Sequence, residues 1–238
     1  RVMKVDSAAV SRSLTFPGEV RARYESRLGF RLGGKLVERR VDVGAVVRKG
    51  QVLARLDAQD ASLNAAQAEA NRALAEAEAK RYRDLRAKNF VSQAVLDAKE
   101  TALKTAAAQA GMARNQAAYT TLIADRDGVV TAIEAEAGQV VAAGQTVVRV
   151  AEGGEREIVI AVPESEVEKV RAATGFEVSL NSVPGRSWQG RLRELAPGAD
   201  AATRTFAARI SVAEADESVR LGMSAGVRVS GGAGDTAM

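Results

Sequence analysis

The chain of 238 residues contains no cysteine and no histidine. Without them, thiol nucleophiles, histidine general bases, Ser-His-Asp triads and Cys/His zinc sites are excluded. The absence of cysteine fits an oxidising compartment. Aromatic residues make up only 4% of the chain, and no apolar run approaches the roughly 18 residues of a transmembrane helix. So little aromatic mass favours several small modules, each with a modest core, over one large globular core.

Basic charge is concentrated near the start of the chain. Residues 1–56 hold 13 Lys/Arg against 5 Asp/Glu, whereas the remainder holds 21 against 25. A basic region of this kind could meet an anionic membrane surface, a nucleic acid or an acidic protein, or it could be the solvated face of a half-buried sheet. Nucleic acid is disfavoured because no stacking aromatics are interleaved with the basic residues.

An internal repeat relates residues 34–55 to residues 128–149 at a constant offset of 94, with no gap. Glycines at the same spacing in both halves permit positive φ in tight turns, and alternating valines and leucines supply one buried face for each half. Neither half is long enough to bury that face alone, so the repeat predicts two copies facing each other in a small sandwich. The residues in register are Gly34/Gly128, Gly44/Gly138, Gly50/Gly144, Gln51/Gln145, Val46/Val140, Val47/Val141 and Arg55/Arg149.

The pattern Val-Gly-(x)5-Gly-Gln-x-Leu at residues 43–53 resembles one half of a lipoyl or biotinyl carrier domain. In those carriers the two halves join directly through a hairpin that displays a modified lysine. Residues 54–60 of this chain read Ala-Arg-Leu-Asp-Ala-Gln-Asp and hold no lysine. A cofactor-carrying subunit is therefore a disfavoured alternative, and no cofactor is expected.

Between the two halves, residues 58–118 consist mainly of strong helix formers and contain no proline. A break at residues 88–92 contains Asn89, which favours turns, and Ser92, a good N-cap for a returning helix. Apolar residues at heptad spacing on each side of the break predict an antiparallel coiled-coil hairpin. The predicted seam is Leu63, Ala66, Ala70, Ala73 and Ala77 on the first arm, and Leu96, Leu103, Ala106, Ala110, Ala113 and Ala117 on the second.

Around this break the sequence resembles a specific family. Arg81, Leu85 four residues later and Ser92 seven residues further on match the Arg-Leu-Ser tip motif of periplasmic adaptors, the HlyD-like membrane fusion proteins. The resemblance implies that the tip engages a TolC-type outer-membrane channel. Arg81 would pair with polar or carbonyl groups, Leu85 would pack in a groove, and Ser92 would allow close approach. Without the resemblance, Arg81 reads as a surface charge, Leu85 as a seam residue and Ser92 as a cap.

After residue 151 the composition changes to short strands separated by Pro-Gly and Leu-Gly turns. Strands are expected at residues 157–162, 176–180, 189–195, 205–212 and 225–229, with a short helix over 163–170. They predict a small β-barrel, which an N-terminal strand around residues 13–20 would complete. The segments Pro163-Glu-Ser-x-Val, Thr203-Arg-Thr-Phe206 and Gly222-Met-Ser-Ala225 are similar to the barrel of the same adaptors.

The predicted fold class is therefore α+β, elongated and built from several modules. An α-helical coiled-coil hairpin is inserted in a lipoyl-like β-sandwich, which is followed by a small β-barrel. The predicted domains are a lipoyl-like domain at 24–57 and 122–151, the hairpin at 58–121, and the barrel at 10–23 and 152–231. Residues 1–9 and 232–238 are expected to be tails or remnants of a membrane-proximal region.

The resemblance implies a non-catalytic function, with no catalytic residue and no metal site. The chain would link an inner-membrane transporter to the TolC-type channel and would associate with itself in a ring, as a hexamer or a trimer of dimers. An RND-type multidrug pump is preferred as the transporter, and an ABC-type exporter or type I secretion system is the alternative. The resemblance also implies a periplasmic location in a Gram-negative bacterium, with attachment to the inner membrane through an anchor not present in this chain.

Overall fold

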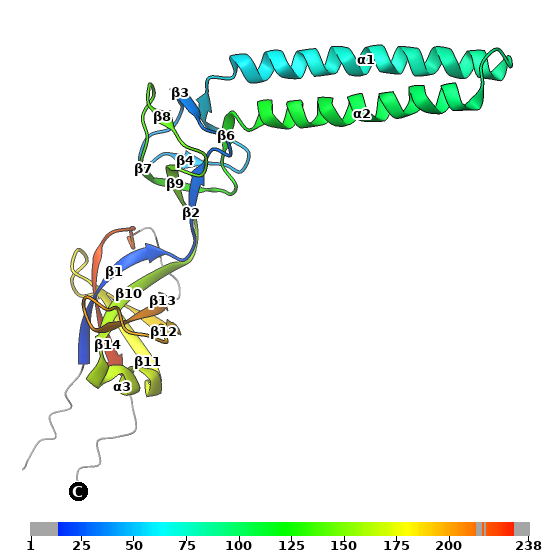
Figure 1. The fold of residues 1–238 in the computed structure, drawn as a ribbon. Helices are drawn as coiled ribbons and strands as arrows, with labels where there is room; N and C mark the ends of the chain where they lie inside the picture. Colours follow the sequence, from blue (N-terminus) through cyan, green and yellow to red (C-terminus); the bar gives the residue numbers. More distant parts are fainter. Residues whose placement is uncertain (1–13, 213–215, 217, 231–238) are drawn as a thin grey trace, which may run out of the picture. The chain divides into compact units, whose positions relative to one another are not determined.

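The computed structural model describes residues 14–212, 216 and 218–230 (Figure 1). The chain divides into two compact units, one formed by residues up to Tyr24 and from Glu152 onward, the other by Glu25–Ala151. The expected tails at 1–9 and 232–238 lie outside the described residues, as do positions 10–13 and 231 of the expected barrel. No helix of the described residues is long and apolar enough to cross a membrane.

The unit Glu25–Ala151 contains two four-stranded sheets. One has the strand order β2-β9-β7-β4 and the other β6-β5-β3-β8. The offset of 94 residues places β3 onto β7, β4 onto β8 and β5 onto β9, so the two sheets have equivalent strand orders. The bounds are β2 Glu25–Gly29, β3 Gly34–Arg39, β4 Val46–Val47, β5 Val52–Leu56, β6 Thr121–Ile123, β7 Gly128–Ile133, β8 Val140–Val141 and β9 Thr146–Glu152.

The two halves of the repeat exchange strands. Strand β3 of the first half pairs with β8 of the second, and β4 pairs with β7. The backbone hydrogen bonds around the turns follow the same symmetry: Gly44 N donates to Val130 O at 2.8 Å, and Gly138 N donates to Leu36 O at 2.6 Å. All four turn glycines, Gly44, Gly50, Gly138 and Gly144, have φ between 78° and 96°. L-residues rarely adopt that conformation, so the repeat of glycine reflects a backbone requirement.

Both sheets contribute to one core. The two halves supply apolar residues at equivalent positions, such as Phe30 and Ala124, Leu36 and Val130, and Leu53 and Val147. The buried cluster also contains Val41, Val47, Ala54, Leu56, Leu122, Ala135, Val141, Val148 and Val150. Because the core is shared, neither half can lose the other without exposing its apolar face.

Helices α1 (Gln59–Ala87) and α2 (Gln93–Ala118) lie side by side along their lengths (Figure 1). Three ion pairs join them: Glu69 to Arg114 at 2.8 Å, Glu78 to Lys99 at 2.8 Å and Arg83 to Glu100 at 2.7 Å. The early residue of α1 pairs near the end of α2, and the two later residues pair nearer its start, so the helices are antiparallel. The coiled-coil winding itself stays a prediction.

The seam between the helices agrees with the sequence on α2 and differs from it on α1. On α2, Leu96, Ala110 and Ala113 are buried, and Leu103, Ala106 and Ala117 are half-buried, which confirms the predicted positions. On α1 the predicted seam is wrong, since Leu63 is 62% exposed and the other four predicted positions are also exposed. The inward positions of α1 are instead Ala61, Ala65, Ala68, Arg72, Ala75, Ala79, Tyr82 and Arg86.

The physical reason is that alanine occupies so many positions of α1 that more than one heptad frame is apolar. The observed frame places Glu69, Glu78 and Arg83 along the borders of the seam, where each meets an opposite charge on α2. It also directs Ala79, which is fully buried, toward α2 and allows the helices a close approach.

The other unit is a closed barrel with the strand order β1-β10-β13-β12-β11-β14. The expected strands and the short helix are confirmed, and β1 completes the barrel by pairing with both β10 and β14. The core contains Phe16, Ile158, Ile160, Phe176, Trp188 and Ile210 among others. The bounds are β1 Leu14–Ala22, β10 Arg156–Pro163, a 3-10 turn at Glu164–Glu166, α3 Val167–Ala172, β11 Gly175–Leu180, β12 Ser187–Leu195, β13 Thr205–Val212 and β14 Ser224–Ser230.

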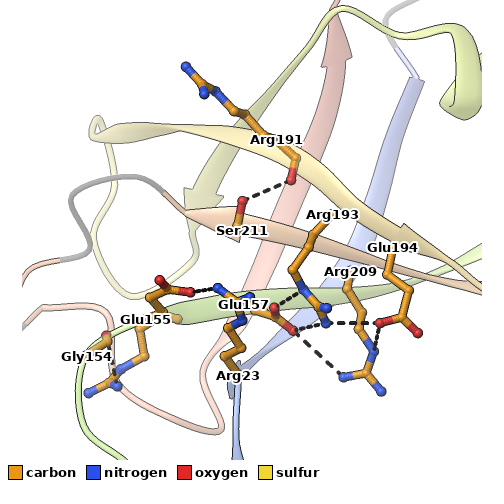
Figure 2. A network of polar contacts seen from close by, with 10 residues as sticks. Arg23, Gly154, Glu155, Glu157, Arg191, Arg193, Glu194, Arg209 and Ser211 are labelled. Atoms are coloured by element: carbon orange, nitrogen blue, oxygen red, sulfur yellow. Dashed lines mark hydrogen bonds and ion pairs between the residues drawn. The ribbon is translucent and has the colours of Figure 1, made fainter.

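One carboxylate of the barrel is completely buried. Glu157 on β10 forms ion pairs with Arg193 of β12 and, at 3.8 Å, with Arg209 of β13 (Figure 2). Arg193 is the extra residue of a β-bulge between Leu192 and Glu194, and the bulge turns its guanidinium toward Glu157. The hydrogen bond to Glu157 raises the pKa of Arg193. Removal of the arginines would leave the buried charge of Glu157 without compensation. The ion pairs therefore favour the observed arrangement of β10, β12 and β13.

Two glycines of the unit Glu25–Ala151 differ in what an added methyl group would meet. A Cβ at Gly128 would lie 2.2 Å from Ala151 O, whereas a Cβ at Gly111 of α2 would meet nothing within 4 Å. We expect Gly128→Ala to lower the free energy of unfolding by about 1–3 kcal/mol, because backbone must move. The matched variant Gly111→Ala should raise it by about 0.5–1 kcal/mol, because alanine is the better helix former. Chemical denaturation of both variants tests the pair, and equal effects would contradict this account.

Candidate docking site at the hairpin tip

The first arm of the hairpin ends in a Schellman motif. Asn89 has a φ of 61°, Phe90 N donates to Leu85 O at 2.9 Å, and Asn89 N donates to Arg86 O at 2.9 Å. These two hydrogen bonds satisfy carbonyl groups at the end of α1 that would otherwise lack a partner within the helix. Asparagine tolerates the left-handed conformation better than most residues. The turn therefore has a defined geometry.

The second arm begins at Ser92, as the sequence predicts. Its φ of −76° and ψ of 160° are those of an N-cap, and its Oγ accepts a hydrogen bond from Val95 N at 3.4 Å. An N-cap side chain satisfies one of the backbone N–H groups that the first turn leaves free. The return of the chain is thus fixed by two local motifs that meet within three residues.

One arginine ties the two motifs together. Arg86 Nε donates to Gln93 Oε1 and Arg86 Nη1 to Asn89 Oδ1, both at 3.2 Å. These bonds connect the end of α1, the turn and the start of α2. A loop held in this way loses little conformational freedom when it binds a partner, and that favours docking.

The three motif residues lie at this tip but do not bond to one another. Arg81 and Ser92 are exposed, and Leu85, one turn beyond Arg81, is half-buried. The positive charge of Arg81 helps to lower the pKa of Glu78, three residues earlier on α1. It also opposes the rise in the pKa of Lys99 on α2. Among the described residues, no hydrogen bond or ion pair holds its guanidinium, which stays free to bind an acceptor on another molecule.

Phe90 is a residue that the sequence reasoning missed. Its side chain is 74% exposed at the turn, and Val95 on the next helix is also exposed. The available signal was an aromatic residue between turn-forming Asn89 and capping Ser92 in a chain with few aromatics. Aromatic residues, phenylalanine among them, are enriched in protein–protein interfaces. The tip can therefore offer a cation, an apolar anchor and hydrogen-bonding groups, which suits non-covalent docking.

The turns of the lipoyl-like module form the second set of predicted positions. The segment where a carrier domain holds its lysine is the end of β5 and the start of α1 in this chain. There Asp57 N donates to Lys35 O at 2.9 Å, and Asp57 Oδ1 accepts from Gln59 N at 3.1 Å. The described residues contain no group of three or more acidic side chains that could hold a metal ion.

Comparison with known proteins gives matches for the barrel and for most of the chain. Residues 158–233 match the family described as the CusB-like, beta-barrel domain. The nodulation protein NolF of Rhizobium meliloti is 27% identical over 213 residues, covering 83% of this chain and 58% of NolF. The cation efflux system protein CusB of Escherichia coli O157:H7 is 35% identical over 109 residues, covering 46% of this chain and 27% of CusB. The chain thus spans little more than half of NolF, and the match covers about a quarter of CusB.

Among solved structures, a chimera of MacA with the α-hairpin domain of Pseudomonas aeruginosa MexA is similar to this chain. The TM-score is 0.81 and the identity 23%, with 91% of this chain and 80% of the chimera covered. At that identity the likeness establishes the fold.

We expect the turn to be sensitive to the residue at position 89. Asn89→Ala should lower the free energy of unfolding by roughly 1 kcal/mol, because alanine resists a positive φ, whereas Asn89→Gly should not. Both variants lose the same hydrogen bond from Arg86, so the difference between them isolates the backbone. Urea unfolding monitored by circular dichroism is the measurement, and equal losses would contradict the proposed turn.

The ion pair between Glu78 and Lys99 predicts that the stability of the hairpin depends on pH. The hydrogen bond from Lys99 lowers the pKa of Glu78 below its ordinary value of 4.5, with a smaller contribution from the charge of Arg81. A lowered pKa in the folded state stabilises the hairpin at pH values above 4.5, and this contribution is lost as the pH falls through the lowered pKa. NMR titration should show the pKa of Glu78 rising toward 4.5 in Lys99→Met but not in Lys104→Met.

Proposed function

Because the chain belongs to the membrane fusion (periplasmic adaptor) protein family, we propose that it links an inner-membrane transporter to a TolC-type outer-membrane channel in the periplasm of a Gram-negative bacterium. The observation that carries the proposal is the tip, a rigid turn with free binding groups at the end of a two-helix hairpin. Neither catalysis nor a cofactor is part of this function.

At the tip, Arg81 would donate to carbonyl or carboxylate groups of the channel, and Leu85 would enter a groove. Ser92 is small and lets the channel approach the start of α2. Phe90 adds an exposed apolar side chain to these three. Each contact is weak alone, and a ring of several copies would bind through many contacts at once.

The preferred transporter is of the RND type. The barrel is similar to the CusB-like domain, and one relative is named as a cation efflux system protein. Both similarities support an efflux system. An adaptor of an ABC-type exporter or of a type I secretion system remains the alternative. The coiled-coil hairpin at 58–121 would then act as a spacer. The lipoyl-like module at 24–57 and 122–151 would be the ring element, and the barrel at 10–23 and 152–231 would contact the transporter.

A carrier function stays disfavoured. The repeat has the glycine turns of a carrier domain, but the segment that would display a lysine leads into α1 instead. A mass spectrum of the purified chain with a lipoyl or biotinyl adduct would revive that function.

The absence of native cysteine allows a direct test of the tip. We expect Ser92→Cys in the full-length protein, treated with a cysteine cross-linker in intact cells, to capture an outer-membrane channel that mass spectrometry identifies. Ser62→Cys is the matched control, because Ser62 is also an exposed serine of the hairpin but lies in the first turn of α1. It should capture no channel.

Capture of a channel by both variants, or of a cytoplasmic protein by Ser92→Cys, would contradict the tip assignment. Co-purification of the transporter with the captured complex would separate RND-type from ABC-type partners, since the two classes differ in sequence and size.

A further inference from the structure

Two short segments join the barrel to the rest of the chain, one between β1 and β2 and the other between β9 and β10. Two backbone hydrogen bonds tie these segments to each other. Glu152 N donates to Tyr24 O at 2.9 Å. Arg23 N donates to Glu155 O at 3.3 Å. The second bond is long, so the segments depend on their side chains to stay together.

The side chains of Arg23 and Glu155 form an ion pair across the two segments (Figure 2). The guanidinium of Arg23 also lies over the ring of Tyr24, 5.1 Å from the ring centre. The hydrogen bond to Glu155 raises the pKa of Arg23. The side chain of Glu155 is 65% exposed, so the carboxylate that holds the segments together is open to solvent.

Arg23 has a second carboxylate within electrostatic reach. The charge of Glu157 contributes to the raised pKa of Arg23, and the charge of Arg23 opposes the rise in the pKa of Arg193, which pairs with Glu157. In the view of Figure 2, the guanidinium of Arg23 lies between Glu155 and Glu157. Its Nε is buried and, within the described part of the chain, has no hydrogen-bond partner. A buried donor without an acceptor costs free energy, so a shift that gave Nε an acceptor would be favourable.

Glu157 can supply that acceptor. Its Oε2 accepts a hydrogen bond from Arg193 Nη2 at 3.1 Å, and Arg209 Nη1 lies 3.8 Å from the same oxygen. A carboxylate has about four acceptor positions, so a further donor can bind. Glu157 belongs to β10 of the barrel, whereas Glu155 precedes that strand. A turn of Arg23 from Glu155 to Glu157 would therefore release the segment and keep the arginine paired.

The segment before β10 can change its conformation easily once this ion pair opens. It begins with Gly153 and Gly154, and a Cβ at either position would meet nothing within 4 Å. Packing therefore does not require glycine at position 153. Two successive glycines leave the backbone many accessible conformations, and hinges are commonly a few residues of this kind between two elements.

We propose that Arg23 is a latch with two positions. In the first it pairs with Glu155 and holds the two segments together, and in the second it pairs with the buried Glu157 and releases the segment that contains the glycines. The latch thereby sets how freely the unit Glu25–Ala151 moves with respect to the barrel. This inference concerns the chain alone and does not depend on which transporter or channel it meets.

Glu155→Gln in the full-length protein tests the latch, because it removes the charge and keeps the shape of the side chain. We expect the backbone amide of Glu152 to exchange its hydrogen roughly two- to fivefold faster, the range of an exposed ion pair. The Nε–H of Arg23 should exchange about fivefold more slowly, because it gains a hydrogen bond to Glu157. NMR of the isotope-labelled protein measures both rates.

Glu177→Gln is the matched control. It also removes an ion pair of the barrel, the one that joins Glu177 on β11 to Arg228 on β14 at 3.2 Å, and it should leave both rates unchanged. Trp188 is the only tryptophan of the chain and is buried in the barrel core, so its fluorescence shows whether each variant stays folded.

Two outcomes of the exchange measurement would overturn the proposal. Faster exchange of the Arg23 Nε–H in Glu155→Gln would show that the arginine is released to water and has no second position. An unchanged rate at the amide of Glu152 would show that the ion pair does not hold the segments together.

Because the chain has no native cysteine, spin labels can measure the motion itself. Labels at Ala143→Cys and Gln189→Cys, which are exposed positions in the two different units, give a distribution of distances by double electron–electron resonance. Adding Glu155→Gln should broaden this distribution, whereas adding Glu177→Gln should not. The same distribution in all three proteins would show that the latch does not control the motion, and the proposal would fail.

Discussion

Two chain segments separated by some 60 residues must meet before either can bury its apolar side, and the unit Glu25–Ala151 is organised around that requirement. The halves exchange strands through β3–β8 and β4–β7, and Leu36 and Val130 occupy equivalent places in one core. The inserted hairpin lies in the connection between the halves. Its two ends are therefore held side by side by the sheet, as Leu56 N donating to Thr120 O at 2.8 Å illustrates. Antiparallel arms of similar length follow from that anchor.

Alanine gives the hairpin its close internal seam and at the same time limits how much the seam can stabilise it. Each buried alanine removes far less apolar surface from water than a leucine would. The ion pairs along the borders, including Glu78 with Lys99, add only modest energy because their side chains are partly exposed. Leu63 and Leu74 of α1 point outward instead, and a sequence that placed them inward would have a stronger hairpin.

The sequence was sufficient for the parts of the fold that depend on backbone requirements. The glycine turns of the repeat, the strands of the barrel and the break at residues 88–92 all follow from local rules that few residues satisfy. The seam of α1 was not predictable in this way. Alanine makes more than one heptad frame of α1 apolar, so the charged residues of α2 decide which frame faces α2. Burial of Glu157 has no local signal, and exposure of Phe90 is indicated locally only by its place between Asn89 and Ser92. The first depends on a bulge at Arg193 in another strand, and the second on the path of the chain after a left-handed residue.

The hairpin has a turn of fixed geometry, but its exposed side chains can each make only a weak contact. At the tip, Arg86 fixes the turn through Asn89 and Gln93, yet the groups left for a partner are single exposed side chains. On the sides of the hairpin, the exposed apolar residues are mainly alanines, with Leu63, Leu74 and Met112 among the larger ones. Contacts through such side chains are weak one at a time, and a fixed geometry lets them add when several are made at once.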